Sequence, residues 1–462
     1  MEEKREVKSD KPIDDQAERR AYRRRRRIRN QIIAYIVAII LLAGIVAGAD
    51  YGIRQLMVIF QEWQAARVAE TPPEEEPPPE DIFVAAEPED TVPEDDGGQD
   101  DDPPEEEQPA PPSALDVYVD ERIAALTLAE KVAGLFFITP EALTGTSPVV
   151  RAGETTRARL DQYPVGGLVY FSANIQSAGQ LGDMLANTRE MSKYPIFLAV
   201  DEEGGRVARV AGARLADNTE PMGAIGASGD PAEAAEAGRT IGTYLAELGF
   251  DLNFAPVADV LTDAEAHPLG DRSFGFEPWV VESMVTAFIS GSAETGVHTA
   301  VKHFPGLGSA MTDTHDGMAI GQRSLEDMRG HDLVPFTGAI SAGVPFVMVG
   351  HISLPDIIGN NTPASLSAKM ISEVLRGEMG FDGIVITDAL NMGAISEYYD
   401  ADEAAIQAIE AGVDMLLMPE DFAAAYDGVM QAVAGGRISE ERIDESLRRI
   451  YRVKYADAAG GE

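Results

Sequence analysis

Cysteine is absent from the 462 residues of this chain. Disulfide bonds, thiol nucleophiles and thiolate metal ligands are therefore excluded. Histidine is scarce, with six copies, so each one is worth examining for a specific role. Basic residues number 37 against 78 acidic ones, which gives a formal net charge of −41. Because so acidic a chain repels phosphate backbones, nucleic acid is not an expected partner.

The charge is distributed unevenly, and its distribution divides the chain. Residues 1–30 carry a net charge of +5, whereas residues 70–112 hold 18 acidic and no basic side chains. Residues 31–69 are neutral, so −28 of the total charge belongs to residues 113–462. The 70–112 segment is rich in proline and acidic residues and has little apolar surface to bury. We expect it to form a disordered, extended stalk, with an acidic activation or metal-binding segment as the alternative.

One long apolar run is present, from Ile32 to Ala49, directly after a cluster of arginines at Arg23–Arg27. As a helix of about 1.5 Å rise per residue it would reach roughly 27 Å, enough to span a bilayer core. The arginines should remain on the cytoplasmic side, which places the rest of the chain outside. The alternatives are a cleavable signal peptide, with Ala47-Gly48-Ala49 as the cleavage site, and a buried core helix.

These features predict four regions. They are a basic cytoplasmic segment (1–31), a transmembrane signal-anchor (32–49), a juxtamembrane segment with the acidic Pro-rich linker (50–112), and a catalytic domain (113–462).

Within the last region, short apolar runs rich in β-branched residues alternate with amphipathic stretches. The runs are Leu135–Ile138, Gly167–Phe171, Ile196–Asp201, Leu252–Asp259, His298–Phe304, Phe346–Ile352, Gly383–Asp388 and Asp414–Pro419. The helical stretches are Ala232–Leu248, Met284–Thr295, Ser367–Glu378, Ala401–Ala411 and a terminal one at Ile438–Tyr455. Eight strand–helix units in about 350 residues predict an α/β fold, a (β/α)8 barrel of the TIM type.

Chemically active side chains stand at or next to the C-terminal ends of five of the predicted strands. They are Asp201, Asp259, Lys302 with His303, His351 and Asp388. A (β/α)8 barrel directs these strand ends toward one mouth, where active sites are built. The coincidence predicts that these side chains form one site.

The densest group lies between Lys302 and His315. His303, Asp313 and His315 leave metal binding open, although their spacing is not that of a helical ligand pair. Proton transfer is the other interpretation. In Asp313-Thr314-His315 the carboxylate is close enough to orient the imidazole and stabilise its charged form, which suits general acid and base catalysis.

Five motifs together resemble glycoside hydrolase family 3. They are Asp201-Glu202-Glu203-Gly204-Gly205-Arg206-Val207, Asp271-Arg272-Ser273-Phe274-Gly275, Lys302-His303-Phe304-Pro305-Gly306, Asp313-Thr314-His315 and Ile386-Thr387-Asp388. Their order and spacing are those of the family over about residues 115–455. The Asp-Thr-His loop resembles the β-N-acetylglucosaminidase branch.

The resemblance implies a retaining double displacement that uses no metal or cofactor. Asp388 would be the nucleophile, and His315 would act as acid and base with Asp313 as its partner. The residues expected to hold the terminal sugar are Asp201, Arg272, Lys302 and His303, supported by Arg209 and His351.

Two positions depart from the family pattern. Leu307 stands where the family usually has histidine, and Ala389 follows Asp388 where a second aspartate is frequent. In two-domain members a second domain can supply active-site residues. Here we expect the barrel to supply them all.

The expected function is hydrolysis of terminal β-linked N-acetylglucosamine from peptidoglycan-derived or related glycans by a membrane-tethered, extracytoplasmic enzyme. A wall-glycan-binding protein with impaired catalysis and a β-glucosidase of the same family are the alternatives. Phosphorolysis is a further possibility for the second half-reaction, because a neutral histidine base does not exclude an anionic acceptor.

Overall fold

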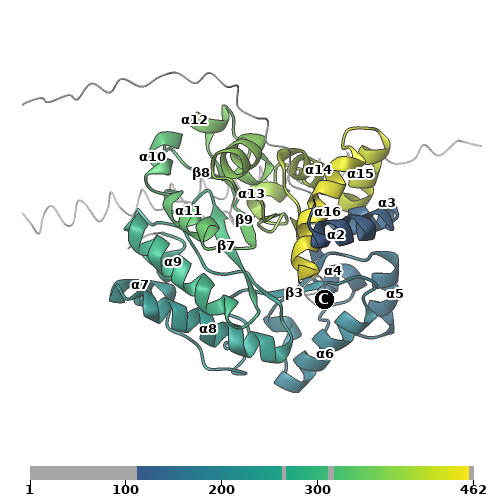
Figure 1. The fold of residues 1–462 in the computed structure, drawn as a ribbon, viewed down its shortest axis with the longest axis horizontal. Coiled ribbons are helices and arrows are strands. Elements are labelled where there is room, and N and C mark those ends of the chain that lie inside the picture. The colour runs from purple at the N-terminus through teal and green to yellow at the C-terminus, as the bar shows by residue number, and fades with distance from the viewer. Residues whose placement is uncertain (1–111, 263–266, 311–316, 457–462) are drawn as a thin grey trace, which may run out of the picture. The chain divides into compact units, whose positions relative to one another are not determined.

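The structure is a computed structural model that describes residues 112–262, 267–310 and 317–456. In these ranges eight parallel strands form a nearly closed barrel (Figure 1). The strands are β1 (Phe136–Ile138), β2 (Gly167–Tyr170), β3 (Phe197–Val200), β6 (Leu252–Asn253), β7 (His298–Phe304), β9 (Phe346–Val349), β11 (Ile384–Thr387) and β12 (Leu416–Leu417). Neighbours in space follow the order of the chain, and a parallel bridge between Ile386 and Met415 joins the last two strands. The predicted TIM-type barrel is confirmed.

The strands form where the sequence is apolar on both faces. In β11, for example, all four residues of Ile-Val-Ile-Thr are buried. A parallel strand covered on one side by helices and on the other by the barrel interior has no solvent face, so its sequence lacks the alternation of polar and apolar residues. This is why eight short continuous runs were sufficient to locate the barrel.

Helices cover the outside of the barrel (Figure 1). Those before β7 are α2 (Ala114–Ala124), α3 (Leu128–Ala133), α4 (Pro140–Thr144), α5 (Glu154–Gln162), α6 (Ala178–Met191), α7 (Met222–Ser228), α8 (Pro231–Leu248) and α9 (Pro278–Ala293). Those after it are α10 (Leu325–Arg329), α11 (Val334–Ser341), α12 (Pro355–Ile358), α13 (Gly393–Ser396), α14 (Ala401–Ala411), α15 (Phe422–Ala434) and α16 (Glu440–Lys454). Three segments of three residues each are also helical: η2 (Ser172–Asn174), η3 (Gly270–Arg272) and η4 (Ala364–Leu366). The ten-residue segment η5 (Lys369–Glu378) has π-helical hydrogen bonding.

Some predicted boundaries differ from the observed ones. The helix expected from Met284 begins six residues earlier, at Pro278, a residue suited to the first turn because it has no N–H that needs a partner. The run Leu252–Asp259 is a regular strand only at Leu252–Asn253, because Pro256 cannot donate to the ladder; Val257 pairs again with Lys302 as an isolated bridge.

Two small sheets lie outside the barrel and were not predicted. A hairpin joins β4 (Glu202–Gly204) to β5 (Val207–Ala208) directly after β3, and β8 (Ala319–Ile320) pairs in parallel with β10 (Ile352–Ser353). All four strands belong to segments that follow the C-terminal ends of barrel strands. They therefore build up the mouth of the barrel.

The first and last described helices meet and complete the ring. In Figure 1, α2 and α3 lie beside α15 and α16. Ion pairs join them, between Arg448 and Asp120 at 2.9 Å and between Arg452 and Asp116 at 2.8 Å. These exposed pairs add little individually, so the apolar packing beneath them stabilises the closure.

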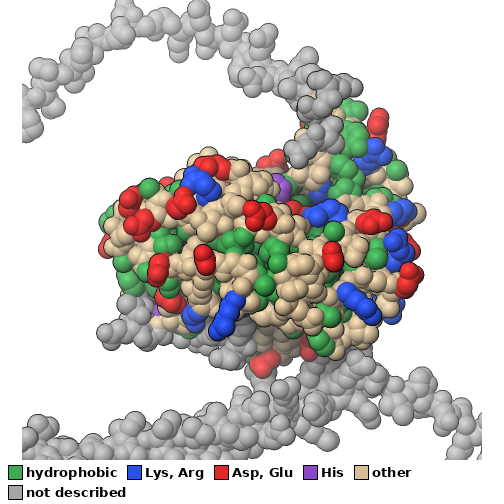
Figure 2. Space-filling view, turned by 90° about the horizontal axis from the view of Figure 1, so that it is seen from below, with side chains coloured by type: hydrophobic (Ala, Val, Ile, Leu, Met, Phe, Trp, Pro, Cys, Tyr) green, Lys and Arg blue, Asp and Glu red, His purple; other side chains and the backbone are tan. Residues whose placement is uncertain are grey.

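The predicted signal-anchor and most of the predicted stalk lie outside the described residues. Within the described ranges, no helix is both long and apolar enough to cross a membrane. On the face shown in Figure 2, basic side chains lie singly among acidic and apolar ones and do not merge into a basic patch.

Candidate active site

The strand ends of the barrel surround a pocket of about 450 Å³. Six of the predicted site residues line it: Asp201, Arg209, Arg272, Lys302, His303 and Asp388. Their positions in sequence extend over nearly two hundred residues, and the barrel brings them together because the parallel strands all end on the same side. Asp313 and His315 lie outside the described residues, so the predicted acid and base pair stays a prediction.

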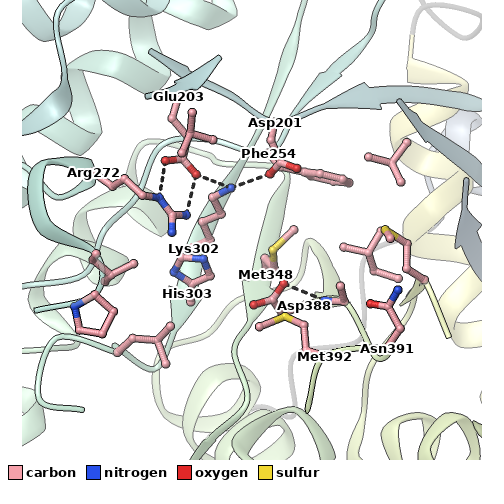
Figure 3. A pocket seen from close by; sticks show the side chains of 18 of the residues that line it. Asp201, Glu203, Phe254, Arg272, Lys302, His303, Met348, Asp388, Asn391 and Met392 are labelled. Carbon is pink, nitrogen blue, oxygen red and sulfur yellow. Dashed lines mark hydrogen bonds and ion pairs between the residues drawn. The ribbon is translucent and has the colours of Figure 1, made fainter. Parts of the chain in front are cut away.

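One wall of the pocket is a chain of alternating charges (Figure 3). Lys302 Nζ lies 2.8 Å from Asp201 Oδ1 and 2.7 Å from Glu203 Oε1. Glu203 in turn accepts two hydrogen bonds of 2.8 Å from Nε and a terminal nitrogen of Arg272. This bidentate geometry fixes the guanidinium plane.

The charges in this wall stabilise one another. Burial raises the pKa of Glu203, but Lys302 and Arg272 outweigh it and bring the pKa to about 2. Burial lowers the pKa of Lys302, but Asp201 and Glu203 reverse this and leave it above its usual value. Glu203, Lys302 and Arg272 are therefore all charged at neutral pH. The wall offers hydrogen-bond donors and acceptors in fixed positions to a ligand with many hydroxyl groups.

Asp388 stands across the pocket from this wall, beside Met348 and Met392 (Figure 3). It follows β11 directly, and its own N–H donates to the carbonyl oxygen of Val349 at 2.8 Å. One carboxylate oxygen accepts the N–H of Ala389 at 2.7 Å. Burial raises the pKa of Asp388, but His303, His351, the Ala389 N–H and Lys302 together hold it below its usual value. An ionised carboxylate whose backbone and side chain are both fixed by hydrogen bonds can act as a nucleophile.

His303 is oriented by a residue that the sequence analysis placed at a strand end without giving it a role. The Nδ1 atom of His303 lies 2.7 Å from Asp259 Oδ2, and the side chain of Asp259 is fully buried. The other oxygen of Asp259 accepts the N–H of Leu307 at 2.6 Å. Asp259 therefore holds both His303 and the start of the following loop in place.

His351 is not part of the pocket lining. It is fully buried, with Nδ1 2.7 Å from Ser365 Oγ and Nε2 3.0 Å from the carbonyl oxygen of Ala389. Because Ala389 donates its N–H to Asp388, His351 supports the candidate nucleophile through the backbone rather than by direct contact with a ligand.

Glu203 is a site residue that the sequence analysis did not select. It adjoins Glu202, and on an extended strand the two side chains point to opposite sides. Glu202 is also buried, but it accepts the backbone N–H groups of Arg209, Val210 and Ala211 and so holds the β4–β5 hairpin. The sequence shows two adjacent glutamates at the end of a predicted strand, and either could have been selected as a site residue. The β4–β5 hairpin determines which of them faces the pocket.

His267 is a second residue missed by the sequence analysis, and it lines the pocket. Its Nδ1 atom accepts the N–H of Leu269 at 3.2 Å, so the proton is on Nε2, which lies 3.2 Å from the carbonyl oxygen of Leu307. His267 thereby fastens Leu307 from the side opposite Asp259. In the sequence, His267 could have been selected because it follows the strand-end residue Asp259 by only eight positions.

The described residues contain no group of three or more His, Asp or Glu side chains arranged to hold a metal ion. Of the three candidate metal ligands, His303 is turned toward Asp259, and the other two lie outside the described ranges. The charged side chains that line the pocket are instead paired with one another: Lys302 with Asp201 and Glu203, and Arg272 with Glu203.

Residues 119–453 match the glycosyl hydrolase family 3 N terminal domain. The chain is 32% identical over 324 residues to beta-hexosaminidase A of Pseudoalteromonas piscicida, covering 64% of this chain and 54% of that protein. It is 36% identical over 298 residues to a beta-hexosaminidase of Xylella fastidiosa (strain M23), covering 62% and 86%. It thus spans about half the length of the first relative and most of the second.

A solved structure is also similar. It is that of a glycoside hydrolase family 3 beta-N-acetylglucosaminidase from Paenibacillus sp. str. FPU-7, with 36% sequence identity and a TM-score of 0.68. The match covers 73% of this chain and 64% of that one.

Proposed function

The chain belongs to glycoside hydrolase family 3, and from this premise we propose that it is a retaining exo-β-N-acetylglucosaminidase. Its substrates would be glycans that end in β-linked N-acetylglucosamine, such as fragments derived from peptidoglycan. One observation carries the proposal: an ionised carboxylate, Asp388, faces a wall of fixed charges across a pocket. The names of the beta-hexosaminidase relatives and of the Paenibacillus enzyme support the choice of an amino sugar.

In the first half-reaction, a carboxylate oxygen of Asp388 attacks the anomeric carbon of the terminal sugar. The bond from that carbon to the bridging oxygen breaks, and the departing oxygen takes a proton from His315. Asp201, Lys302 and Arg272 hold the hydroxyl groups of the sugar so that its anomeric carbon lies near Asp388. The product is a glycosyl ester on Asp388 with inverted configuration.

In the second half-reaction, water attacks the same carbon and gives its proton to His315. The ester bond to Asp388 breaks, the carboxylate is regenerated, and the second inversion restores the original configuration. Asp313 would stabilise the positively charged imidazole that this proton transfer produces.

Water rather than phosphate is the proposed acceptor. Lys302 and Arg272 are the cations that would attract phosphate into the wall of the pocket, but carboxylates engage both of them. An anion entering there would have to compete with Asp201 and Glu203. This favours hydrolysis.

The proposed location is extracytoplasmic, with residues 32–49 as a retained single-pass anchor and residues 70–112 as a stalk. The support is the arginine cluster before an apolar run of eighteen residues. Protease added to intact cells after removal of the wall should release the catalytic domain. Release only after cell lysis would contradict this topology, and a mature N-terminus at Asp50 would indicate a cleaved signal peptide.

The activity is tested with the full-length chain in detergent, on aryl β-glycosides of N-acetylglucosamine and glucose, in buffers with and without phosphate. We expect turnover of the N-acetylglucosaminide, release of the β-anomer as the first product by NMR, and free sugar in both buffers. Preference for the glucoside would favour the β-glucosidase, and a sugar 1-phosphate would show phosphorolysis. If no substrate is turned over while glycan binding persists, the chain is a binding protein.

A further inference from the structure

Asp332 is a fully buried residue in the short connection between α10 and α11. Neither of its carboxylate oxygens has a hydrogen-bond partner among the described residues. Most buried polar groups are hydrogen-bonded, because a buried charge without partners costs stability. Asp332 does not line the pocket, and the sequence analysis did not select it. A carboxylate that makes the fold less stable in this way is explained most simply by a role in function.

The side chain of Asp332 contacts the start of the loop that follows β7. It packs against Gly306, where an added Cβ atom would lie 2.9 Å from Asp332 Cβ. Gly306 has a φ of +123°, and its N–H donates to the carbonyl oxygen of His303 at 2.8 Å. Because no side chain fits between the two residues, the backbone turn after His303 rests directly on Asp332.

Arg323 lies at the other end of the same loop. Its Nε atom is 3.3 Å from Asp332 Oδ2, which is within ion-pair distance but lacks hydrogen-bond geometry. The chain just before Arg323 is anchored, because β8 pairs with β10 and the Gly321 N–H donates to the carbonyl oxygen of Ser353 at 2.9 Å. Asp332 therefore contacts both ends of one loop, Gly306 where the loop leaves the barrel and Arg323 where it returns.

The sequence between these two ends contains Asp313 and His315, the predicted acid and base pair. Proton transfer requires hydrogen-bond reach, and a displacement of about 1 Å can lower a rate about a hundredfold. We propose that Asp332 and Arg323 are positioning residues for the proposed reaction: the ionised carboxylate attracts Arg323 and so fixes the two ends of this loop relative to each other. The inference rests on the proposed function and extends it to two residues outside the pocket.

Protonation of Asp332 removes the attraction to Arg323. Among the described residues, the charged or titratable groups that face Asp332 are Arg323, His331 and Asp259. Burial raises the pKa of Asp332 to about 7, with Arg323 opposing the increase and Asp259 adding to it. His331 Nδ1 lies 3.6 Å from Asp332 Oδ2, and burial and Arg323 lower the pKa of His331, so this imidazole is neutral where Asp332 ionises. The ion pair with Arg323 therefore forms as the pH rises through about 7.

The test measures kcat/KM of Asp332→Asn and of the wild type, as full-length chains, at about pH 5.5 and about pH 8. The substrates are two aryl N-acetylglucosaminides, one whose leaving group needs a proton and one whose leaving group departs without one. On the first substrate, the ratio of variant to wild type should be about 1 at the lower pH and fall about 5- to 10-fold at the higher pH, because asparagine cannot ionise and attract Arg323. On the second substrate, the ratio should change less than about twofold.

Variants of Arg323 test the other half of the pair. Arg323→Gln should lower kcat/KM at about pH 8 to a similar extent, and Arg323→Lys, which keeps the positive charge, should retain most of the activity. The double variant Asp332→Asn/Arg323→Gln should lose no more than either single variant, because each change removes the same ion pair. Arg329→Gln is the matched control, since the ion pairs of Arg329 with Glu326 and Glu378 join exposed side chains.

The same ratio of Asp332→Asn to wild type at both pH values, or equal losses on both substrates, would overturn the proposal. If the wild type turns over no substrate, the proposed function fails, and hydrogen exchange measured by mass spectrometry tests the positioning by itself. Peptides that cover residues 303–310 and 317–323 should then exchange severalfold faster in Asp332→Asn than in the wild type at about pH 8, and equally at about pH 5.5. Equal exchange at both pH values would refute the positioning role.

Discussion

Asp388 combines the two properties that a carboxylate nucleophile needs. It is held rigidly, by its position directly after β11 and by the hydrogen bond from Ala389. It is also kept ionised, because His303, His351 and Lys302 offset the effect of burial on its pKa.

Asp388→Asn should therefore lower kcat by about three orders of magnitude or more, because an amide cannot form the glycosyl ester. The fold should persist, since asparagine keeps the shape of the side chain and the acceptor for the Ala389 N–H. Kinetics on an aryl N-acetylglucosaminide and circular dichroism measure the two effects. Asp427→Asn, on the exposed side of α15, is the control. A similar loss of activity in that variant would show that Asp388 is not the nucleophile. Labelling of Asp201 instead of Asp388 by a fluorinated sugar would show the same.

Asp332 is a buried carboxylate next to the loop that follows β7. It lies against Gly306, in the loop after β7, and neither of its oxygens has a hydrogen-bond partner among the described residues. Arg323 Nε is 3.3 Å from one oxygen. Burial raises the pKa of Asp332 to about 7, with Arg323 opposing the increase and Asp259 adding to it.

Asp332 should make the protein less stable as pH rises. Its pKa is about 7 when folded and near 3.8 when unfolded, so between these values the folded state binds the extra proton and stability falls with increasing pH. Asp332→Asn should leave stability near pH 4 unchanged and raise it at pH 8 by on the order of 2–4 kcal/mol. Urea unfolding at the two pH values measures this. An equal effect of the substitution at both pH values would contradict the prediction.

The loop after β7 is the element that most directly connects fold and chemistry. It begins at Pro305 and leads toward Asp313 and His315. Leu307 is its fixed point, because Asp259 accepts its N–H and His267 donates to its carbonyl oxygen. The histidine that the family usually has at this position is therefore not needed to hold the backbone of the loop.

His267→Ala should loosen this loop and so impair delivery of the proton by the residues that follow. We expect kcat/KM to fall about tenfold on substrates with a poor leaving group and less on those that leave without a proton. His267→Asn keeps one donor and one acceptor and should retain more activity. Equal losses on both kinds of substrate would show that His267 supports the fold and not proton transfer.

For the whole molecule, net charge is the dominant property. The pocket is locally balanced, since Asp201 and Glu203 face Lys302 and Arg272, but the domain around it is strongly acidic. Long-range repulsion therefore acts on anionic substrates before they reach the pocket, whereas neutral oligosaccharides are not repelled.

Salt should consequently affect the two substrate classes differently. Raising NaCl from about 20 to 300 mM shortens the Debye length to below about 10 Å and screens the repulsion. We expect kcat/KM to increase severalfold on muramic-acid-containing fragments that carry free carboxylates and to change little on neutral N-acetylglucosamine oligomers. A decrease on the anionic fragments would instead indicate attraction by a basic region at the mouth.

The sequence by itself determined the barrel and most of its site. Burial on both faces of each strand produces continuous apolar runs, which are local signals, and the parallel order of a (β/α)8 barrel then places Asp201, Lys302, His303 and Asp388 on one side. The anchor at residues 32–49, and Asp313 with His315 as the acid and base pair, rest on sequence alone and stay predictions.

The tertiary structure decided which side chains bind one another. Lys302 meets Asp201 across 101 positions of sequence, and His303 meets Asp259 across 44. The tertiary structure also decided that Glu203 rather than Glu202 faces the pocket. His351 does not line the pocket and hydrogen-bonds instead with the carbonyl oxygen of Ala389, the residue after Asp388. No local pattern contains this information, because the partner of a buried charge is chosen by packing: each charge must find its counter-charge among whichever groups the closed barrel brings within hydrogen-bond distance.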